Sequence, residues 1–310
     1  MKTIVTSAHV RLTLVVLFVA LLVPATGVAF AAGPAKVDLG DTESFAILSG
    51  SNSTTPSTRS VGNTGTSTIT GDVGVWPDGS ITGFGTVTLN GAQHLNDAAA
   101  EAAQTSLAAA YADAAGRTPA TIANALGGVT LTTGVYTPVQ GGFLIDGTLT
   151  LDGQGDPDAV FIFQCTSLDA VSDSTVKLIN GARFCRVFWQ VVGNARAGVT
   201  IDSGAEFEGH VFTQGAIMVS GATVHGQLLS VNGPVELNAS TITQIACADM
   251  PSPPPTIPPK AVIASHSAPK LPATGYAPEK HDRSWLPMAL ALAAGTALLF
   301  AAWRLGSSTR

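Results

Sequence analysis

The sequence contains few charged and few aromatic residues. Only 12 % of its 310 residues are Asp, Glu, Lys or Arg, about half of the roughly 25 % found in an average soluble domain. The 15 basic residues are outnumbered by 21 acidic ones, which argues against a strongly basic nucleic-acid-binding protein. Hydrophobic residues still make up 45 % of the chain, so a wholly disordered chain is also excluded.

The sequence also lacks the short motifs of common enzymes. It has no G-x-S-x-G nucleophile motif, no H-E-x-x-H zinc motif and no phosphate-binding P-loop. His210 and His225 lie near Glu206 and Glu208, but a repeat would turn these side chains to different faces, so we predict no metal site. The acidic run Asp152–Asp158 is typical of a turn, with calcium binding or a catalytic carboxylate pair as alternatives. We expect no enzyme activity and no cofactor.

The first residues have the pattern of an export signal. Lys2 and Arg11 precede an apolar run, Leu12–Val23, and the small-residue stretch Ala29–Ala31 follows. A charged region, an apolar region and an A-x-A site together predict a secretory signal peptide over residues 1–32. The alternative is an uncleaved membrane anchor.

A second apolar run, Trp285–Trp303, carries no charge and is followed by Arg304 and Arg310. At 1.5 Å per residue a helix of this length spans roughly 28 Å, which is enough for a bilayer core. The basic tail is expected to stay inside the cell. Residues 249–270 are rich in proline and predict an extended stalk.

Between the stalk and the apolar run lie Leu271, Pro272, Ala273, Thr274 and Gly275. In this position the motif resembles the cell-wall sorting signal of Gram-positive bacteria. The resemblance implies that a sortase-type transpeptidase cuts between Thr274 and Gly275 and links the protein to peptidoglycan. It also implies that residues 271–310 form a sorting signal, with the apolar run as a transmembrane span. The alternative is a permanent single-span anchor.

The remaining residues, 33–248, predict an all-β domain. Gly accounts for 33 residues of the chain, and short runs rich in Val, Ile, Thr and Phe alternate with Gly and Asn. Examples of these runs are Ser67–Thr70, Val199–Ile201, His210–Thr213 and Gln227–Val231. Gly-Ala pairs recur at Gly181, Gly204 and Gly221. Repeats of about 20 residues indicate a solenoid with glycines at its corners.

One segment, 95–116, breaks this pattern and predicts a long helix. Alanine, the best helix former, dominates it. Asn96 or Asp97 can cap its start, and Gly116 can end it. A stripe that includes Leu95 and Leu107 is expected to pack on the solenoid.

Several runs, in the same order, resemble the microbial ice-binding-protein family. They are Ser44–Gly50, Asn63–Val75, the alanine-rich segment, Leu131–Thr137, Gly147–Gly153, Ala159–Gln164 and Leu178–Val191. The resemblance covers about residues 40–247. It implies a right-handed β-solenoid of triangular section with the helix alongside, whose N-terminal part closes against later coils. It also implies adsorption to ice without chemistry or cofactor.

Such a fold suits adsorption to ice, because stacked strands repeat every 4.7–4.9 Å, close to a lattice repeat of ice of roughly 4.5 Å. In the family, ice-facing coils carry Thr or Ser, a small residue, any residue, then Thr or Asn. Ser220–Thr223 matches this pattern, and Thr64–Ser67 and Asn238–Thr241 match it in part. The resemblance therefore assigns ice contact to Thr64, Thr66, Ser203, Ser220, Thr223, Asn238 and Thr241. Two related runs end in a charge instead, at Arg183 and Glu206.

The three cysteines, Cys165, Cys185 and Cys247, all lie in the exported part, where oxidation is expected. We favour a Cys185–Cys247 disulfide that ties the last coil to the domain. A Cys165–Cys185 disulfide is the alternative, and one cysteine is left over either way.

These observations predict a secreted, monomeric ice-binding protein anchored in the cell wall of a Gram-positive bacterium, or in the membrane if unprocessed. Its expected partners are the ice surface, the transpeptidase and peptidoglycan, and no nucleic acid. The alternative is a cell-wall-anchored adhesin or structural module on the same fold that binds glycan or another surface.

Overall fold

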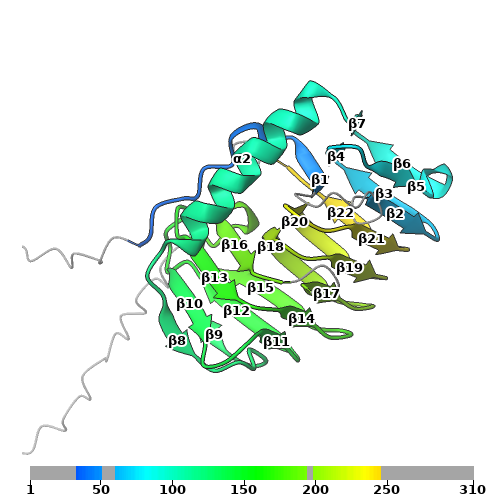
Figure 1. The fold of residues 1–310 in the computed structure, drawn as a ribbon. Helices are drawn as coiled ribbons and strands as arrows, with labels where there is room; N and C mark the ends of the chain where they lie inside the picture. Colours follow the sequence, from blue (N-terminus) through cyan, green and yellow to red (C-terminus); the bar gives the residue numbers. More distant parts are fainter. Residues whose placement is uncertain (1–32, 51–59, 194–197, 246–310) are drawn as a thin grey trace, which may run out of the picture. The chain divides into compact units, whose positions relative to one another are not determined.

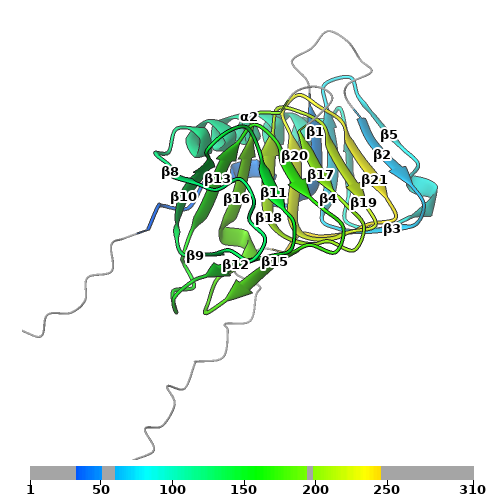
Figure 2. The ribbon, with the colours of Figure 1, turned by 90° about the horizontal axis from the view of Figure 1, so that it is seen from below.

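The computed structural model describes residues 33–50, 60–193 and 198–245. All of them belong to one compact unit. Every strand pair in these ranges is parallel, and the strands form a 15-stranded and a 7-stranded sheet. Successive turns of the chain place their strands on three faces in rotation, as expected for a β-solenoid (Figures 1 and 2).

The first face is covered by the helix. Along the stack its strands are β8 (Ala120–Ile122), β10 (Gly134–Pro138), β13 (Phe161–Cys165), β16 (Val187–Val191), the second halves of β18 (Glu206–Thr213) and β20 (Thr223–Ser230), β1 (Phe45–Gly50), β4 (Asp72–Trp76) and β7 (Gln93–Leu95).

The second face consists of strands that carry many threonines, and we call it the threonine face. Its strands are β9 (Thr130–Leu131), β12 (Thr148–Asp152), β15 (Thr175–Ile179), the first halves of β18 and β20, β22 (Thr241–Thr243), β3 (Ser67–Thr70) and β6 (Val87–Asn90). In Figure 2, the helix α2 (Ala98–Ala115) lies on one side of the stack, and β9, β12 and β15 lie on the opposite side.

The third face is the 7-stranded sheet. In order it contains β11 (Phe143–Ile145), β14 (Leu168–Ala170), β17 (Val199–Ile201), β19 (Ile217–Ser220), β21 (Val235–Asn238), β2 (Ser60–Thr64) and β5 (Ser80–Thr82). Three short 3-10 turns, η1 (Gly40–Thr42), η3 (Phe84–Thr86) and η4 (Phe184–Arg186), complete the regular structure that the described residues form.

The N-terminal strands close one end of the stack. Leu48 of β1 pairs with Leu229 of β20, and Thr68 of β3 pairs with Thr241 of β22. Strands β1 and β3 therefore stack directly on the last described coil, as the resemblance implied. We call this the cap end of the solenoid.

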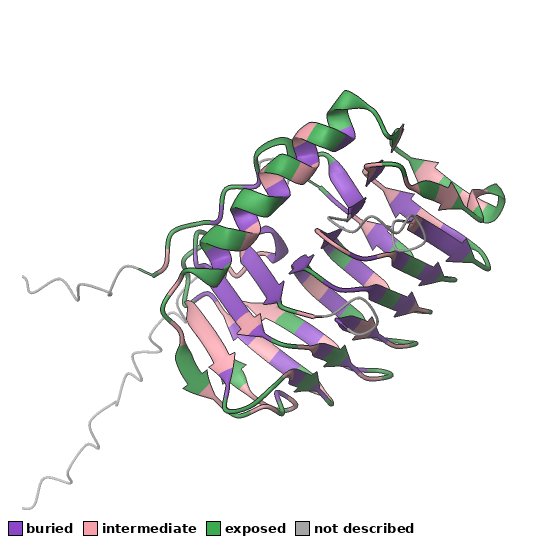
Figure 3. Cartoon of the chain, viewed as in Figure 1, coloured by how far each residue is buried: buried purple, intermediate pink, exposed green. Residues whose placement is uncertain are grey.

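The core fills the inside of the coils. Side chains alternate along each strand, so apolar residues such as Leu149, Leu151 and Ile242 are buried while their neighbours face outward (Figure 3). Phe163 and Trp189 from successive coils stack with their ring centroids 4.0 Å apart. Each coil buries its apolar face only by stacking on its neighbours.

The predicted helix is present as α2 (Ala98–Ala115). The side chain of Asp97 accepts a hydrogen bond from the amide of Ala100, and Gly116 follows the last turn. Leu107 is fully buried in a cluster with Phe188 and Phe212 of the first face. The prediction was wrong at one point: Leu95 belongs to β7, and its exposed fraction is 49 %.

The helix joins the two ends of the solenoid. It leaves β7 at the cap end and returns the chain to β8 at the opposite end (Figure 1). Within the described ranges, no helix is both long and apolar enough to cross a membrane. The expected signal peptide, stalk, sorting motif and C-terminal span lie outside the described residues.

Candidate functional site

The threonine face presents a regular pattern of outward side chains. In β3, β12 and β22, two threonines flank one inward apolar residue, giving the triplets Thr68–Thr70, Thr148–Thr150 and Thr241–Thr243. The central residues are buried, whereas the flanking threonines are partly or fully exposed. The period-two alternation of a strand thus separates core residues from a polar surface.

The first outward residue of each triplet forms one row across the strands. In register order the row is Thr148, Thr175, Glu206, Thr223, Thr241, Thr68 and Thr88. Every member is paired directly with the next. At about 4.8 Å per strand, the row extends over roughly 29 Å.

The second outward residue of each triplet forms a parallel row. From the end opposite the cap, it contains Thr130, Thr150, Lys177, Glu208, His225, Thr243, Thr70 and Asn90. Both rows are neutral at their ends and charged in the middle. The neutral part nearest the cap end is the larger one.

The other two faces lack such rows. The first is covered by α2. On the third, the corresponding outward positions hold Leu144, Asp169, Thr200, Met218 and Glu236, a mixture of apolar, polar and acidic side chains. Among the described faces, the threonine face is therefore the one on which threonines recur in register from strand to strand.

The charged residues in the middle form what we call the charged seam: Lys177, Glu206, Glu208 and His225. The Nδ1 atom of His225 lies 2.9 Å from the Oε1 atom of Glu208 on the neighbouring strand. This hydrogen bond raises the pKa of His225 above its usual value, although partial burial acts in the opposite direction. Glu206 stands between Thr175 and Thr223 in the first row.

The residues assigned from the sequence lie in two places. Thr223 and Thr241 are members of the first row. The other five lie at the edge of the face. Ser220, Asn238 and Thr64 stack in register at the ends of the third-face strands, whereas Ser203 and Thr66 lie in the turns that lead to β18 and β3.

Most of the first row was missed by the sequence reasoning. Thr68, Thr88, Thr148 and Thr175 were not assigned, because the family pattern directs attention to the turn before each strand. The available signal was the triplet itself, a polar residue on each side of an apolar one. The triplet begins β12, β15, β18, β20 and β22, and in β3 and β6 it begins one residue later. The two-residue strand β9 starts at Thr130, which belongs to the second row.

Of the two charges that end related runs in the sequence, Arg183 and Glu206, one does not reach the threonine face. The amide of Gly204 donates a hydrogen bond to the carbonyl oxygen of Gly221, so these two glycines occupy equivalent corners in successive coils. The equivalent residue in the preceding coil is Asp173, which has φ +60° and donates to the carbonyl of Ser203. Gly181 instead follows β15, one corner further on. Arg183 therefore lies outside the threonine face, and only Glu206 interrupts its first row.

The cysteines take different roles. Cys185 is disulfide-bonded, whereas Cys165 is a free, buried thiol. The alternative Cys165–Cys185 pairing is therefore wrong, because Cys165 stacks on Val191 rather than on Cys185. Cys247 lies outside the described residues, so its pairing with Cys185 stays a prediction.

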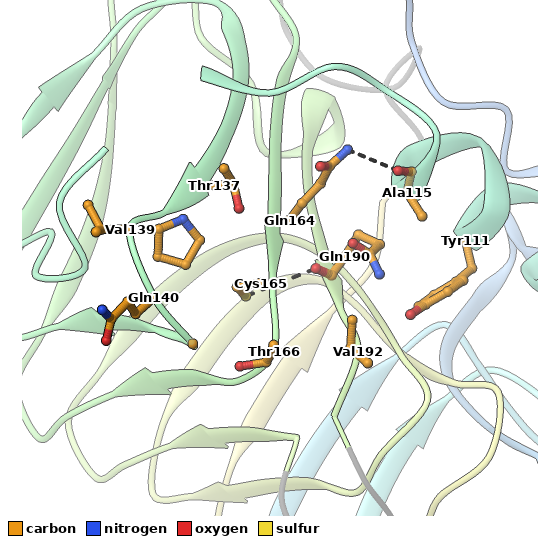
Figure 4. A pocket seen from close by; sticks show the side chains of 12 residues that line it. Tyr111, Ala115, Thr137, Val139, Gln140, Gln164, Cys165, Thr166, Gln190 and Val192 are labelled. Carbon is orange, nitrogen blue, oxygen red and sulfur yellow. Dashed lines mark hydrogen bonds between the residues drawn. The ribbon is translucent and has the colours of Figure 1, made fainter. Parts of the chain in front are cut away.

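A recess of about 400 Å³ lies between the C-terminal end of α2 and strands β10, β13 and β16 (Figure 4). Gln164 points into this region, and its Nε2 atom donates to the carbonyl oxygens of Ala114 and Arg117, each at 2.7 Å. Gln164 thus fastens the end of the helix to the sheet. Burial raises the pKa of Cys165, which also lines the recess, to about 12.

The described residues contain no group of three His, Cys, Asp or Glu side chains that could hold a metal ion. The loop that begins at Asp152 is a turn held by its own side chains. The Oδ1 atom of Asp152 accepts from the amide of Gln154, and Asp158 pairs with Arg186. These contacts agree with the turn predicted for this loop.

Proteins of similar sequence and fold define the class to which this domain belongs. A profile of the family described as Ice-binding-like matches residues 56–243, and the chain belongs to this family. The family is non-enzymatic, which agrees with the expectation that the protein is not an enzyme.

Two curated relatives and one solved structure are similar to most of the domain. An ice-binding protein of Nostoc sp. (strain HG1) is 34 % identical over 69 % of this chain and 76 % of its own length. One from Colwellia sp is 36 % identical over 70 % and 87 %. The crystal structure of an ice-binding protein from an Antarctic biological consortium superposes with a TM-score of 0.62 at 35 % identity, covering 69 % of this chain and 93 % of that one.

Proposed function

We propose that this protein binds ice through the threonine face. The observation that carries the proposal is the run of four threonines in the first row, Thr223, Thr241, Thr68 and Thr88, whose neutral hydroxyl and methyl groups repeat at the spacing of stacked parallel strands. Threonine is stiff at χ1, so each group is held at a nearly fixed position. A flat array of fixed groups can order water at ice-like spacings. The family relationship supports ice over the adhesin hypothesis.

The test is a bulky substitution on the face. Thr241→Tyr places a large ring in the middle of the neutral array and should abolish inhibition of ice recrystallisation. Thr200→Tyr, on the outward side of the third face, is the matched control and should behave like the wild type. Full-length protein in a mild detergent is used, with a detergent blank and thermal melts of each variant. Equal inhibition of ice recrystallisation by both variants would reject the proposal that the threonine face binds ice.

We also propose that the protein is displayed on the cell surface. The support is in the sequence: an export signal at residues 1–32, a proline-rich stalk, the Leu271–Gly275 motif and an apolar run with a basic tail. A tethered protein would hold a cell to ice, or shape ice at its surface, rather than act in bulk fluid. The expected partners in display are a sortase-type transpeptidase and peptidoglycan.

Cell fractionation tests this part of the proposal. Wall material digested with a muralytic enzyme should yield protein whose last residue is Thr274, joined to a peptidoglycan fragment. The variant Pro272→Ala should remain in the membrane fraction. Wall-linked protein in equal amounts from the wild type and the variant would contradict processing at this motif.

A further inference from the structure

The charged seam crosses the face proposed to bind ice and divides its threonines into two separate arrays. It occupies the middle strands, β15, β18 and the start of β20. On the cap side lie Thr223, Thr241, Thr68, Thr88, Thr243, Thr70 and Asn90, which we call the cap-end array. On the other side lie Thr130, Thr148, Thr150 and Thr175, the far-end array.

Charged side chains disturb an ice-like layer of ordered water. A carboxylate or ammonium group holds its own hydration shell, and removing that shell without a partner is costly. Glu206 and Lys177 are exposed on the face. The Glu208–His225 pair satisfies one carboxylate, but it still places two polar, ionisable groups where the neighbouring coils present threonine.

We propose that the charged seam confines ice adsorption to the cap-end array, and that Glu206 is the residue that limits the length of the ice-binding row. This inference rests on the proposed function. Glu206 is the only residue of the first row that is not threonine, and it has a threonine on each side. The row therefore contains four consecutive threonines on the cap side and two on the far side.

Two tyrosine variants locate the active array. Thr68→Tyr, inside the cap-end array, should abolish inhibition of ice recrystallisation. Thr148→Tyr, in the far-end array, should leave the inhibitory concentration unchanged within about twofold, because that array is too short to hold the protein on ice without the other. Equal loss of activity in both variants would overturn the inference, since ice would then contact the face on both sides of the seam.

Removing the charge gives the opposite kind of test. Glu206→Thr makes the first row continuous over seven coils, and the inhibitory concentration should fall by about twofold or more as the contact lengthens. The matched control is Glu236→Thr, which removes an exposed carboxylate from the third face and should change nothing. Gain of activity in both variants, or in neither, would overturn the inference.

The second row provides a further step. The variant that also carries Lys177→Thr, Glu208→Thr and His225→Thr converts three charged triplets into threonine triplets, and we expect it to be more active than Glu206→Thr alone. Circular dichroism and melting curves establish that each variant is folded. If the combined variant does not fold, the single variants still test the inference. Absence of any inhibition by the wild type would reject the proposed function itself. That outcome differs from one in which the wild type is active but the inference about the charged seam is overturned.

Discussion

Threonine suits the outward positions of these coils for reasons that lie in a single side chain. Its β-branch favours extended backbone, and its χ1 angle has few alternatives there. Its hydroxyl and methyl groups offer water one polar and one apolar site of similar size. Thr241 combines these properties with an exposed position in the register between Thr223 and Thr68.

At the same scale, Cys165 is chemically protected. Burial raises the pKa of its thiol to about 12, so almost no thiolate is present near neutral pH. We predict that the folded protein does not react with iodoacetamide at about pH 8, whereas the protein unfolded in guanidinium reacts fully. Mass spectrometry of the alkylated protein measures this. Rapid labelling of Cys165 in the folded protein would contradict the prediction.

His225 should make stability depend on pH. Its folded-state pKa is raised by Glu208, so the stabilisation is complete below the unfolded-state pKa of about 6.5 and is lost as pH rises through the folded-state value. Because the side chain is nearly half exposed, the expected contribution is within the ~0.2–1 kcal/mol of exposed ion pairs.

The comparison that isolates this contribution is wild type against His225→Gln. The wild type should melt at a higher temperature than the variant in mildly acidic buffer, and this difference should shrink in alkaline buffer. A difference that grows as pH rises would have the wrong sign for a protonated histidine beside Glu208.

At the scale of elements, the eight-residue strands β18 and β20 turn from the threonine face onto the helix-covered face without a break. Gly209 and Gly226 pair at this corner with φ of +117° and +143°. A Cβ atom on Gly226 would lie only 1.9 Å from the carbonyl oxygen of Gly209. Only glycine allows both the backbone conformation and the close stacking.

We therefore predict that Gly226→Ala destabilises the protein by more than about 1 kcal/mol. The control is Gly85→Ala, where a Cβ atom would meet nothing within 4 Å. Chemical denaturation of both variants measures the difference. Similar midpoints for the two would show that the corner tolerates a side chain.

Much of this element structure could be predicted from the sequence. Ser67–Thr70 and Val199–Ile201 are strands with the predicted bounds, and the helix begins and ends at the predicted caps. The predicted runs His210–Thr213 and Gln227–Val231 covered only the second halves of β18 and β20. The first halves are short triplets, Glu206–Glu208 and Thr223–His225, that directly follow the turns at Ser203 and Ser220 and were not predicted as strands.

The candidate site was harder to predict because it depends on register. Thr68 and Thr241 are far apart in the chain, and nothing local in the sequence shows that they become neighbours when the N-terminal strands close on the last coil. Local sequence also fails to show that Arg183 lies off the threonine face, because its repeat resembles that of Glu206 but begins at a different corner of the solenoid. Pairing between distant strands, rather than propensity, determined which side chains share a face.

At the scale of the whole domain, the three faces of the solenoid differ in what covers them and in the side chains they present. The helix closes the first face and joins the two ends of the stack. The third face carries mixed side chains, and the threonine face is left open with its rows aligned across the coils. Parallel stacking is what turns a three-residue pattern into a surface about 29 Å long.

The measurement that tests this account most directly is the partition of the protein between ice and liquid during slow growth of an ice crystal. Fluorescently labelled full-length protein should be taken into the ice, while the Thr68→Tyr, Thr241→Tyr double variant should stay in the liquid as a folded protein. Equal partition of the two into the ice would show that adsorption does not use the threonine face, and exclusion of both would show that the protein does not bind ice.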